Sequence, residues 1–370
     1  MVWGRMVYHL SRRTAPDGYR VYDAPHDSFP FHLALDPTDN QVGAPFTPPG
    51  EGLQVALVRA DYEETLEIPE GLAELKKKPG VVRGSNGNVY LANKKIKRER
   101  YEDVPALLEA LESGEVDVAL VDVELAPAIL EEYAGKFRQE GQPFGHRYWL
   151  GTDQRGRDML SRTLAGGKTV LLVAVLAAII SGVTGISLGL FSGFWGGGPD
   201  RVLSLVMDSI YSFPGLILAI AMAAMLGPGE LNIAVAIAVV YIPTYFRVVR
   251  GQVLSVKEGV FVEAARSLGA RPGTVLFQYI FPNVIPSIVV VFSLNVADAI
   301  LTEAGLSFIG LGLQEVPDWG WDLSNGQNYV AAGQWWMITF AGIMITLVTL
   351  GFSLLGEGLS EILNPRLVEG

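Results

Sequence analysis

The sequence contains no cysteine and only four histidines among its 370 residues. The absence of cysteine excludes disulfides, thiol catalysis and cysteine-ligated metals. The histidines are His9, His26, His32 and His146, and their spacing matches no metal motif such as HExxH. A formal net charge of −11 argues against nucleic acid as a partner, because phosphate binding needs a basic surface. We therefore expect no metal, no other cofactor and no nucleic-acid site.

Positive charge is scarce in the second part of the chain. Of the 28 Lys and Arg, 20 lie between Arg5 and Arg162, and only 8 fall in the last 208 residues. The hydrophobic fraction of 49% and the mean hydropathy of +0.30 are high for a soluble domain of this size. The chain therefore divides near residue 165 into a polar part and an apolar part.

Long apolar runs follow this boundary. A bilayer core of about 30 Å needs about 20 mostly apolar residues in a helix. Five segments qualify: 168–194, 203–227, 231–249, 284–312 and 333–356. Small residues such as Gly185 and Gly189 favour close packing between membrane helices. The length of the segments disfavours a soluble bundle of five buried helices, so the sequence predicts an all-α polytopic membrane domain with five spans.

The basic residues of the apolar part indicate its orientation. Five of the eight lie at the end of the third segment or between it and the fourth: Arg247, Arg250, Lys257, Arg266 and Arg271. Short basic loops stay in the cytoplasm. The loops 227–230 and 314–328 contain neither Lys nor Arg. We therefore expect the loop 250–283 and the C-terminus in the cytoplasm, and residues 1–165 outside.

Residues 1–145 alternate strand-like and helix-like runs, which is typical of a small α/β domain. The strand-like runs are 53–58, 88–91 and 116–121, and the helix-like runs are 104–111 and 128–137. Met1–Leu10 is short and interrupted by Arg5, so it predicts neither a span nor a cleavable signal peptide. Because this domain is expected outside, we also expect a further apolar span encoded upstream of Met1.

The basic loop itself contains helix signals. Ser255 and Glu258 have the spacing of a capping box, which predicts a helix start near Val256. Gly269 suits the end of that helix, and Pro272 suits the first turn of another. Such a helix either lies along the lipid headgroups or presents a thin surface to another protein.

The residues of this loop resemble the motif of a known protein family. Glu263-Ala264-Ala265-Arg266, then Gly269, then Phe281-Pro282 look like the EAA loop of binding-protein-dependent ABC importer permeases. In that family the loop forms the coupling helix, which sits in a cleft of the ATPase subunit. The resemblance implies coupling roles for Glu263, Ala264, Ala265, Arg266, Gly269 and Pro282.

Further motifs are similar to the dipeptide/oligopeptide branch of these permeases. The pre-membrane GTDxxGRDxxSR segment is represented by Gly151, Thr152, Asp153, Gly156, Arg157 and Asp158. The stretches 301–312, 317–320 and 355–359, and Asn364-Pro365-Arg366, also fit the branch. The resemblance covers about residues 143–367.

The resemblance implies a type I ABC importer permease fold. The implied domains are 1–145, an extracytoplasmic α/β domain or insertion, 146–166, a pre-membrane segment, and 167–367, the transmembrane domain. The implied function is a permease subunit of the inner membrane that forms half of a path for di- or oligopeptides. Its partners would be a second permease subunit, two ABC ATPase subunits and an extracytoplasmic substrate-binding protein.

No enzymatic site is expected in this chain, because hydrolysis of ATP would belong to the ATPase partners. Gly167-Lys168-Thr169 matches the end of a P-loop, but Arg162 stands where the pattern GxxxxGK[ST] requires glycine. A membrane sensor with an extracytoplasmic ligand-binding domain is the alternative function. A secondary transporter is third, and the inverted repeat typical of many such proteins is not evident.

Acidic residues in membrane segments are candidates for function. Asp208, Asp298 and Glu303 mark either a polar translocation path or an interior polar pair that fixes helix packing. The tryptophans at 319, 321, 335 and 336 are expected to anchor the chain at the membrane interface.

Overall fold

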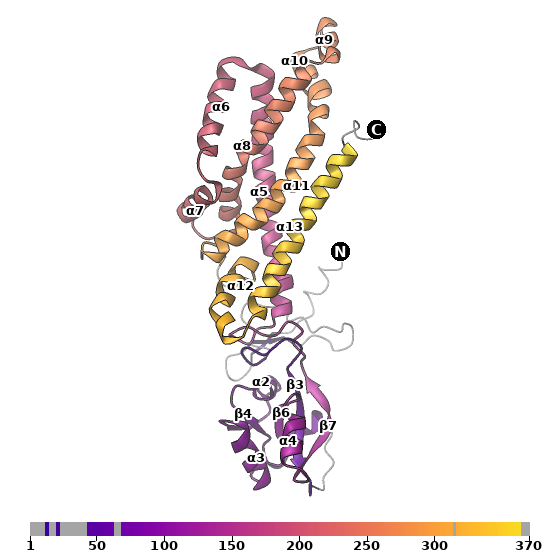
Figure 1. Cartoon of the computed structure of the whole chain (residues 1–370), viewed down its shortest axis with the longest axis vertical. Coiled ribbons are helices and arrows are strands. Elements are labelled where there is room, and N and C mark those ends of the chain that lie inside the picture. Colours follow the sequence, from indigo (N-terminus) through magenta and orange to yellow (C-terminus); the bar gives the residue numbers. More distant parts are fainter. Residues whose placement is uncertain (1–11, 15–19, 23–42, 63–67, 314–315, 364–370) are drawn as a thin grey trace. The chain divides into compact units, whose positions relative to one another are not determined.

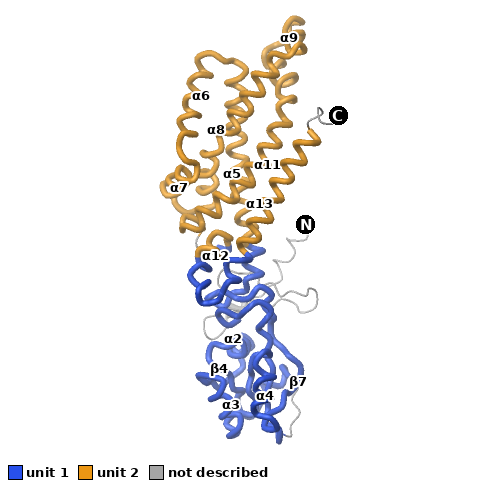
Figure 2. Tube along the Cα trace, in the orientation of Figure 1, with its two compact units in different colours: residues 1–165, 315–317, 325–340 blue, residues 166–314, 318–324, 341–370 orange. Residues whose placement is uncertain are grey.

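The computed structural model describes residues 12–14, 20–22, 43–62, 68–313 and 316–363, whose helices and strands are labelled in Figure 1. The chain forms two compact units (Figure 2). The α/β unit comprises Met1–Ala165, Glu315–Pro317 and Asn325–Phe340. The helical unit comprises Gly166–Gln314, Asp318–Ser324 and Ala341–Gly370. The N-terminal segment Met1–Leu10, with His9, and the residues His26 and His32 lie outside the described residues.

The α/β unit is built on a five-stranded mixed sheet of order β5-β4-β6-β3-β7. Its elements in chain order are β3 (Leu53–Arg59), η1 (Glu70–Ala73), β4 (Gly80–Val82), α2 (Asn86–Asn93), β5 (Glu99–Tyr101), α3 (Val104–Glu112), β6 (Ala119–Asp122), α4 (Ala126–Glu132) and β7 (Phe137–Gly145). Strand β4 is parallel to β5 and β6, whereas β3 is antiparallel to β6 and β7. A separate antiparallel pair joins β1 (Arg12–Thr14) to β2 (Arg20–Tyr22).

The predicted α/β character of this region is confirmed, but the sequence pattern does not predict β4, β5 or β7, and α4 ends at Glu132 rather than at residue 137. The run 88–91, expected as a strand, lies inside helix α2. Ser85 starts that helix, because its hydroxyl accepts a hydrogen bond from the Asn88 amide at 3.2 Å. A run as short as 88–91, of which only the last three residues are apolar, fits a strand and a helix equally well, so the cap decides.

Among the residues that the structure describes, four helices are long and apolar enough to cross a membrane, or up to five if a bent pair forms one span, and most of their length lies in the helical unit. They are α5 (Met159–Trp195), α8 (Glu230–Lys257), the continuous stretch Pro272–Phe308 and α13 (Trp336–Leu363). That stretch comprises α10 (Pro272–Thr274), the π-helix η2 (Val275–Ile280) and α11 (Phe281–Phe308). The helical unit also contains α9 (Val260–Ser267) and most of α12 (Trp319–Gly326). The 3-10 helix η3 (Gln327–Ala332) belongs to the α/β unit.

The second predicted span, 203–227, is not one straight helix. It consists of α6 (Gly197–Tyr211) and α7 (Gly215–Leu226), which meet at an angle of 90° and turn sharply between their labels in Figure 1. Pro214 explains the break, because it lacks an amide hydrogen and restricts the residue before it to extended conformations. The pair is therefore either a broken span or a re-entrant loop.

Helices α5 and α8 pack with their backbones almost touching. A Cβ atom added at Gly185 would lie 2.7 Å from the Ile242 carbonyl oxygen, and one at Gly189 would lie 2.8 Å from the Phe246 carbonyl oxygen. Gly193 continues the stripe, because its added Cβ would lie 2.9 Å from the Val253 Cβ. The expected role of small residues in close helix packing is thus confirmed.

Candidate functional site

The basic loop between α8 and α11 folds around the short helix α9. Helix α8 extends to Lys257, so the helix start predicted near Val256 is wrong. Gly259 occupies the N-cap position of α9, and Ser255 lies within α8. The capping-box pattern does not operate here, because α8 itself uses the backbone groups that the box would have satisfied.

Helix α9 ends as the sequence predicts. Gly269 has a φ of +83°, a left-handed conformation that glycine adopts without strain. Its amide donates to the Arg266 carbonyl at 2.9 Å, and the Ala270 amide donates to the Ala265 carbonyl at 3.0 Å. These two bonds form a Schellman motif, which satisfies the last carbonyls of the helix. Pro272 then begins α10, as expected.

Helix α9 has one buried face and one exposed apolar face. Val262 and Ala265 are buried, and Val262 belongs to an apolar cluster with side chains of α5 and α8. On the other side Val260 and Leu268 are 81% and 89% exposed, and Phe261 is 47% exposed. The helix therefore presents apolar surface to its surroundings.

The predicted coupling residues of α9 divide between these two faces. Glu263, Ala264, Arg266 and Gly269 are exposed, whereas Ala265 is buried. Ala264 adds little side-chain bulk to the exposed face. Another protein could therefore approach the backbone of α9 at that position.

Pro282 lies in the first turn of α11, directly after the π-helix η2. Proline has no amide hydrogen to donate, and π-helical turns are frequent at functional sites. Pro282 is exposed, and the buried side chains of η2 belong to Val275, Leu276 and Ile280. The structure thus places Pro282 after the loop that carries α9.

The pre-membrane segment folds into a tight polar loop inside the α/β unit. Asp153 accepts hydrogen bonds from the amides of Arg155 and Arg157 at 2.8 and 2.9 Å, and its other oxygen pairs with the Arg157 side chain at 2.5 Å. Gly151 and Gly156 have φ values of +74° and +70°. A Cβ at Gly151 would lie 2.7 Å from the Thr47 carbonyl oxygen, so this position also lacks space for a side chain.

The end of the same segment caps α5. Asp158 precedes the helix and accepts from the Ser161 amide at 2.9 Å and from the Ser161 hydroxyl at 2.6 Å. Burial raises the pKa of Asp158, and the hydrogen bonds from Ser161 act against this shift. Thr152 is also buried, and its carbonyl accepts from the Trp336 indole at 3.0 Å. The predicted motif residues therefore gather in one structural loop.

Glu303 lies in a buried polar cluster of the helical unit. The Ser307 hydroxyl lies 2.9 Å from a Glu303 carboxyl oxygen and 3.1 Å from an Asp318 carboxyl oxygen. Asp318 also accepts from the Trp321 amide at 3.0 Å. The side chains of Glu303, Ser307 and Asp318 are at most 1% exposed. This arrangement favours the packing role for Glu303, because the cluster joins α11 to the start of α12.

The two other membrane acids lie elsewhere. Asp208 is exposed on α6 and forms an ion pair with Arg247 of α8 at 2.7 Å. Asp298 is exposed on α11, and its main-chain carbonyl accepts from the Thr302 hydroxyl at 2.9 Å. Glu303, in contrast, is bound to Ser307 in the buried cluster. The three acids therefore do not form one site.

Two of the four tryptophans expected at a membrane interface are buried instead. Trp319 is 1% exposed and packs in the main apolar cluster of the helical unit. Trp336 is 5% exposed and packs beside Met159 and Met337 in the α/β unit. The glycines at 166 and 167 leave room for the Trp319 ring, whose atoms lie 3.0 Å from a Cβ added at either position. Trp335, at 51% exposure, presents its ring at the surface as an interfacial anchor would.

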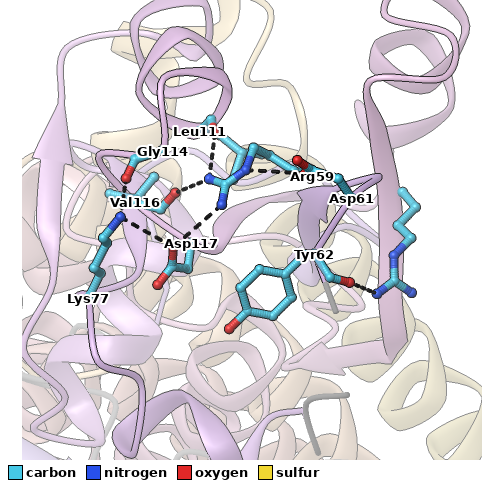
Figure 3. Close-up of polar contacts among 9 residues, drawn as sticks. Arg59, Asp61, Tyr62, Lys77, Leu111, Gly114, Val116 and Asp117 are labelled. Carbon is cyan, nitrogen blue, oxygen red and sulfur yellow. Dashed lines mark hydrogen bonds and ion pairs between the residues drawn. The ribbon is translucent and has the colours of Figure 1, made fainter. Parts of the chain in front are cut away.

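The sequence does not predict a charged cluster that the structure shows on the α/β unit (Figure 3). Arg59 at the end of β3 donates to the Leu111 carbonyl at 3.1 Å and lies 3.4 Å from Asp61 and 3.8 Å from Asp117. Lys77 lies 3.7 Å from Asp117 and also donates to the Gly114 carbonyl. Because these groups satisfy one another around the end of α3, the cluster stabilises that helix terminus.

The structure also shows what the P-loop-like residues do. Gly167, Lys168 and Thr169 lie inside α5, where the backbone amides belong to the helix. A phosphate-binding loop needs free amides before a helix begins. Among the described residues, no group of three or more His, Cys, Asp or Glu side chains gathers that could hold a metal ion.

Comparison with known proteins identifies the family. The family described as "Binding-protein-dependent transport system inner membrane component" matches residues 185–369. A probable D,D-dipeptide transport system permease protein of Escherichia coli K12 is 41% identical over 220 residues, which cover 59% of this chain and 74% of that protein. A glutathione transport system permease protein of Pectobacterium atrosepticum is 39% identical over 245 residues, covering 66% and 80%.

Among solved structures, a chain of the MetNI methionine ABC transporter in an inward-facing conformation aligns with a TM-score of 0.48 and 17% identity. The alignment covers 56% of this chain and 98% of that chain. The family match spans half of this sequence, and the relatives named above match it along most of their length. This chain belongs to the family of inner membrane components of binding-protein-dependent transport systems, the permease subunits of ABC importers.

Proposed function

We propose that this chain forms half of the path through which an ABC importer moves di- or oligopeptides across the inner membrane. The substrate class follows the functions of the relatives, which are named as permeases for D,D-dipeptides and glutathione. A second permease subunit would form the other half, and a substrate-binding protein would deliver the peptide. The observation that carries the coupling role is the exposed apolar face of α9.

Helix α9 is the surface that we assign to the ATPase partner. Val260, Phe261 and Leu268 expose apolar area that a partner would bury, and Ala264 lets the partner approach the backbone. Charges at positions 263 and 266 lie beside this surface. The P-loop-like residues lie within a helix, which supports the assignment of ATP hydrolysis to the partner.

The orientation proposed for the chain places α9 in the cytoplasm and the α/β domain 1–145 outside. The basic residues around α9 support this orientation. Cysteine labelling tests it, since the chain has no native cysteine. Lys97→Cys on the α/β unit should react with a membrane-impermeant reagent in intact cells, whereas Ser255→Cys on α8 should not. Both residues are exposed. The reverse pattern would refute the orientation.

Asp298 is the membrane acid that we assign to the path. Its side chain is exposed on an apolar helix, and a carboxylate facing lipid is costly. A position on the path would instead place it near the ammonium group of a peptide. Asp298→Asn should then raise the KM for import without changing the amount of assembled transporter.

Import by the reconstituted system tests the main proposal. The chain is assembled with its partner subunits in vesicles, and ATP is supplied on the side of the membrane that α9 faces. Transport of a labelled dipeptide to that side is then measured. Ala264→Trp should abolish uptake, because the indole would block docking of α9. Ala73→Trp, at an exposed position of the α/β unit, is the matched control and should leave uptake unchanged. Normal uptake by Ala264→Trp would refute the coupling role.

A further inference from the structure

Three helices meet in a polar cluster near α9 in the helical unit. Arg250 of α8 binds Asp200 of α6 through two hydrogen bonds, of 2.5 and 2.8 Å. Ser192 of α5 donates to the same carboxylate. The side chain of Asp200 is 15% exposed and that of Arg250 is 32% exposed. A two-pronged pair of this kind fixes the relative orientation of its helices as well as their separation.

Helices α5 and α8 are already joined without this pair. The glycine stripe brings their backbones together, and Lys257 donates to the Phe194 carbonyl at 2.6 Å. Val262 of α9 packs in one cluster with Phe194 and Val253, so α9 contacts the same two helices. A displacement of α9 therefore reaches both α5 and α8 through packed apolar side chains.

Helix α6 is attached much more weakly. Met207 is its only buried side chain, in a helix that the structure describes completely. A second ion pair, Arg247–Asp208, joins α6 to α8, but its side chains are 43% and 61% exposed. Exposed pairs of this kind contribute little to stability. The Asp200–Arg250 pair is thus the firmer of these two polar connections between α6 and the helices that contact α9.

We propose that the Asp200–Arg250 pair is the joint that passes movement of α9 to α6, and through the bend at Pro214 to α7. Both are positioning residues, which act on the path through the helices that they hold. This inference rests on the proposed function and extends it, because it names the residues that carry the coupling beyond α9. Without the Asp200–Arg250 pair, α8 would move with α9 but α6 would not follow it.

The test measures import and ATP hydrolysis on the same vesicles that contain the complete transporter. Asp200→Asn should lower the number of peptides imported per ATP hydrolysed about tenfold, a factor comparable to the loss of one charge-assisted hydrogen bond. ATP hydrolysis itself should continue. Arg250→Lys keeps the positive charge but cannot form the two parallel hydrogen bonds to Asp200. The number of peptides imported per ATP hydrolysed should therefore fall less than in Asp200→Asn. The exchanged pair Asp200→Arg with Arg250→Asp should recover part of the lost ratio.

Asp208→Asn is the matched control, because it breaks the exposed pair between the same two helices and should change the ratio by less than about twofold. A normal ratio in Asp200→Asn, or equal losses in Asp200→Asn and Asp208→Asn, would overturn the proposal. If Asp200→Asn fails to assemble with the ATPase, a normal ratio in Arg250→Lys would overturn it. The proposed function is judged separately, by ATP-driven uptake in the unchanged transporter and its loss in Ala264→Trp.

Discussion

The two units of the molecule bury different kinds of side chain. In the α/β unit the core around α3 consists mainly of large apolar residues, such as Leu107 and Leu111, which are both fully buried. In the helical unit the interior is rich in small residues, such as Ala174, Ala177 and Ala234. Most of the exposed large apolar residues among those described belong to the helical unit. Water drives large apolar groups inward, whereas helices in lipid gain from close backbone packing.

The largest effect is expected from creating a cavity in the core of the α/β unit. Leu111→Ala should destabilise the α/β unit by about 2–5 kcal/mol, because it removes a fully buried side chain and leaves a cavity. Hydrogen exchange of the complete chain in lipid nanodiscs, followed in β3 and α3, measures the loss. Leu354→Ala, at a position 57% exposed on α13, is the control and should leave exchange in α13 nearly unchanged.

The complementary change adds a large side chain to the close contact between α5 and α8 in the helical unit. Gly185→Leu should destabilise the helical unit by about 3 kcal/mol. The reason is that its Cβ would lie 2.6 Å from the Tyr245 Cβ and force α5 away from α8. Thermal unfolding in nanodiscs reports the change. Gly351→Leu on α13, where an added Cβ meets nothing within 4 Å, should unfold at the temperature of the parent protein. Equal sensitivity of the two glycines would contradict the close packing of α5 on α8.

A smaller effect is expected in the buried cluster that joins α11 to α12. Glu303→Ala should cost about 1–3 kcal/mol, because it deprives Ser307 of a partner and opens space beside Asp318. Glu303→Gln keeps the shape and an acceptor oxygen and should retain most of the stability. Thermal unfolding of both variants distinguishes a packing role from a role in transport. Loss of import by Glu303→Gln at unchanged stability would favour the path.

The smallest effect concerns the cap of α5. Asp158→Ala should cost about 1 kcal/mol, as for other helix N-caps, whereas Asp158→Asn keeps a capping oxygen. Burial raises the pKa of Asp158, so ionising it in the folded state costs stability. The stability of the parent protein relative to Asp158→Asn should therefore fall as the pH rises through that pKa. Thermal unfolding across a pH series measures this difference, and a difference that does not change with pH would contradict the raised pKa.

The sequence predicts much of the fold because its strongest signals are local. The apolar runs identify the long helices, and Gly269 and Pro272 give the end of α9 and the start of α10. The break within 203–227 does not follow from the presence of Pro214, because membrane helices often tolerate proline. The helix at 88–91 does not follow from its apolar residues, because its deciding signal is the cap at Ser85.

The candidate site is predictable only in part, for a different reason. The motif residues of the loop are visible in the sequence, but which of them face outward depends on packing, as the burial of Ala265 shows. Asp200 and Arg250 lie on separate helices, and Ser307 of α11 joins Glu303 to Asp318, which lies just before α12. A single sequence contains no signal for such pairs, because their partners are chosen by the tertiary fold.

Strands β3 and β7, the first and last strands of the five-stranded sheet in sequence order, lie side by side, and this bears on how the chain evolved. Leu53 and Gly145 are paired across β3 and β7, and the Tyr148 amide donates to the Glu51 carbonyl at 2.8 Å just beyond them. The polypeptide thus leaves the domain beside the point where it enters. A module with adjacent ends can be gained or lost within a chain by closing a short turn. Removing residues 53–145 would therefore require only a short connection between the two ends. The loop at Asp153 would keep its own hydrogen bonds to Arg157.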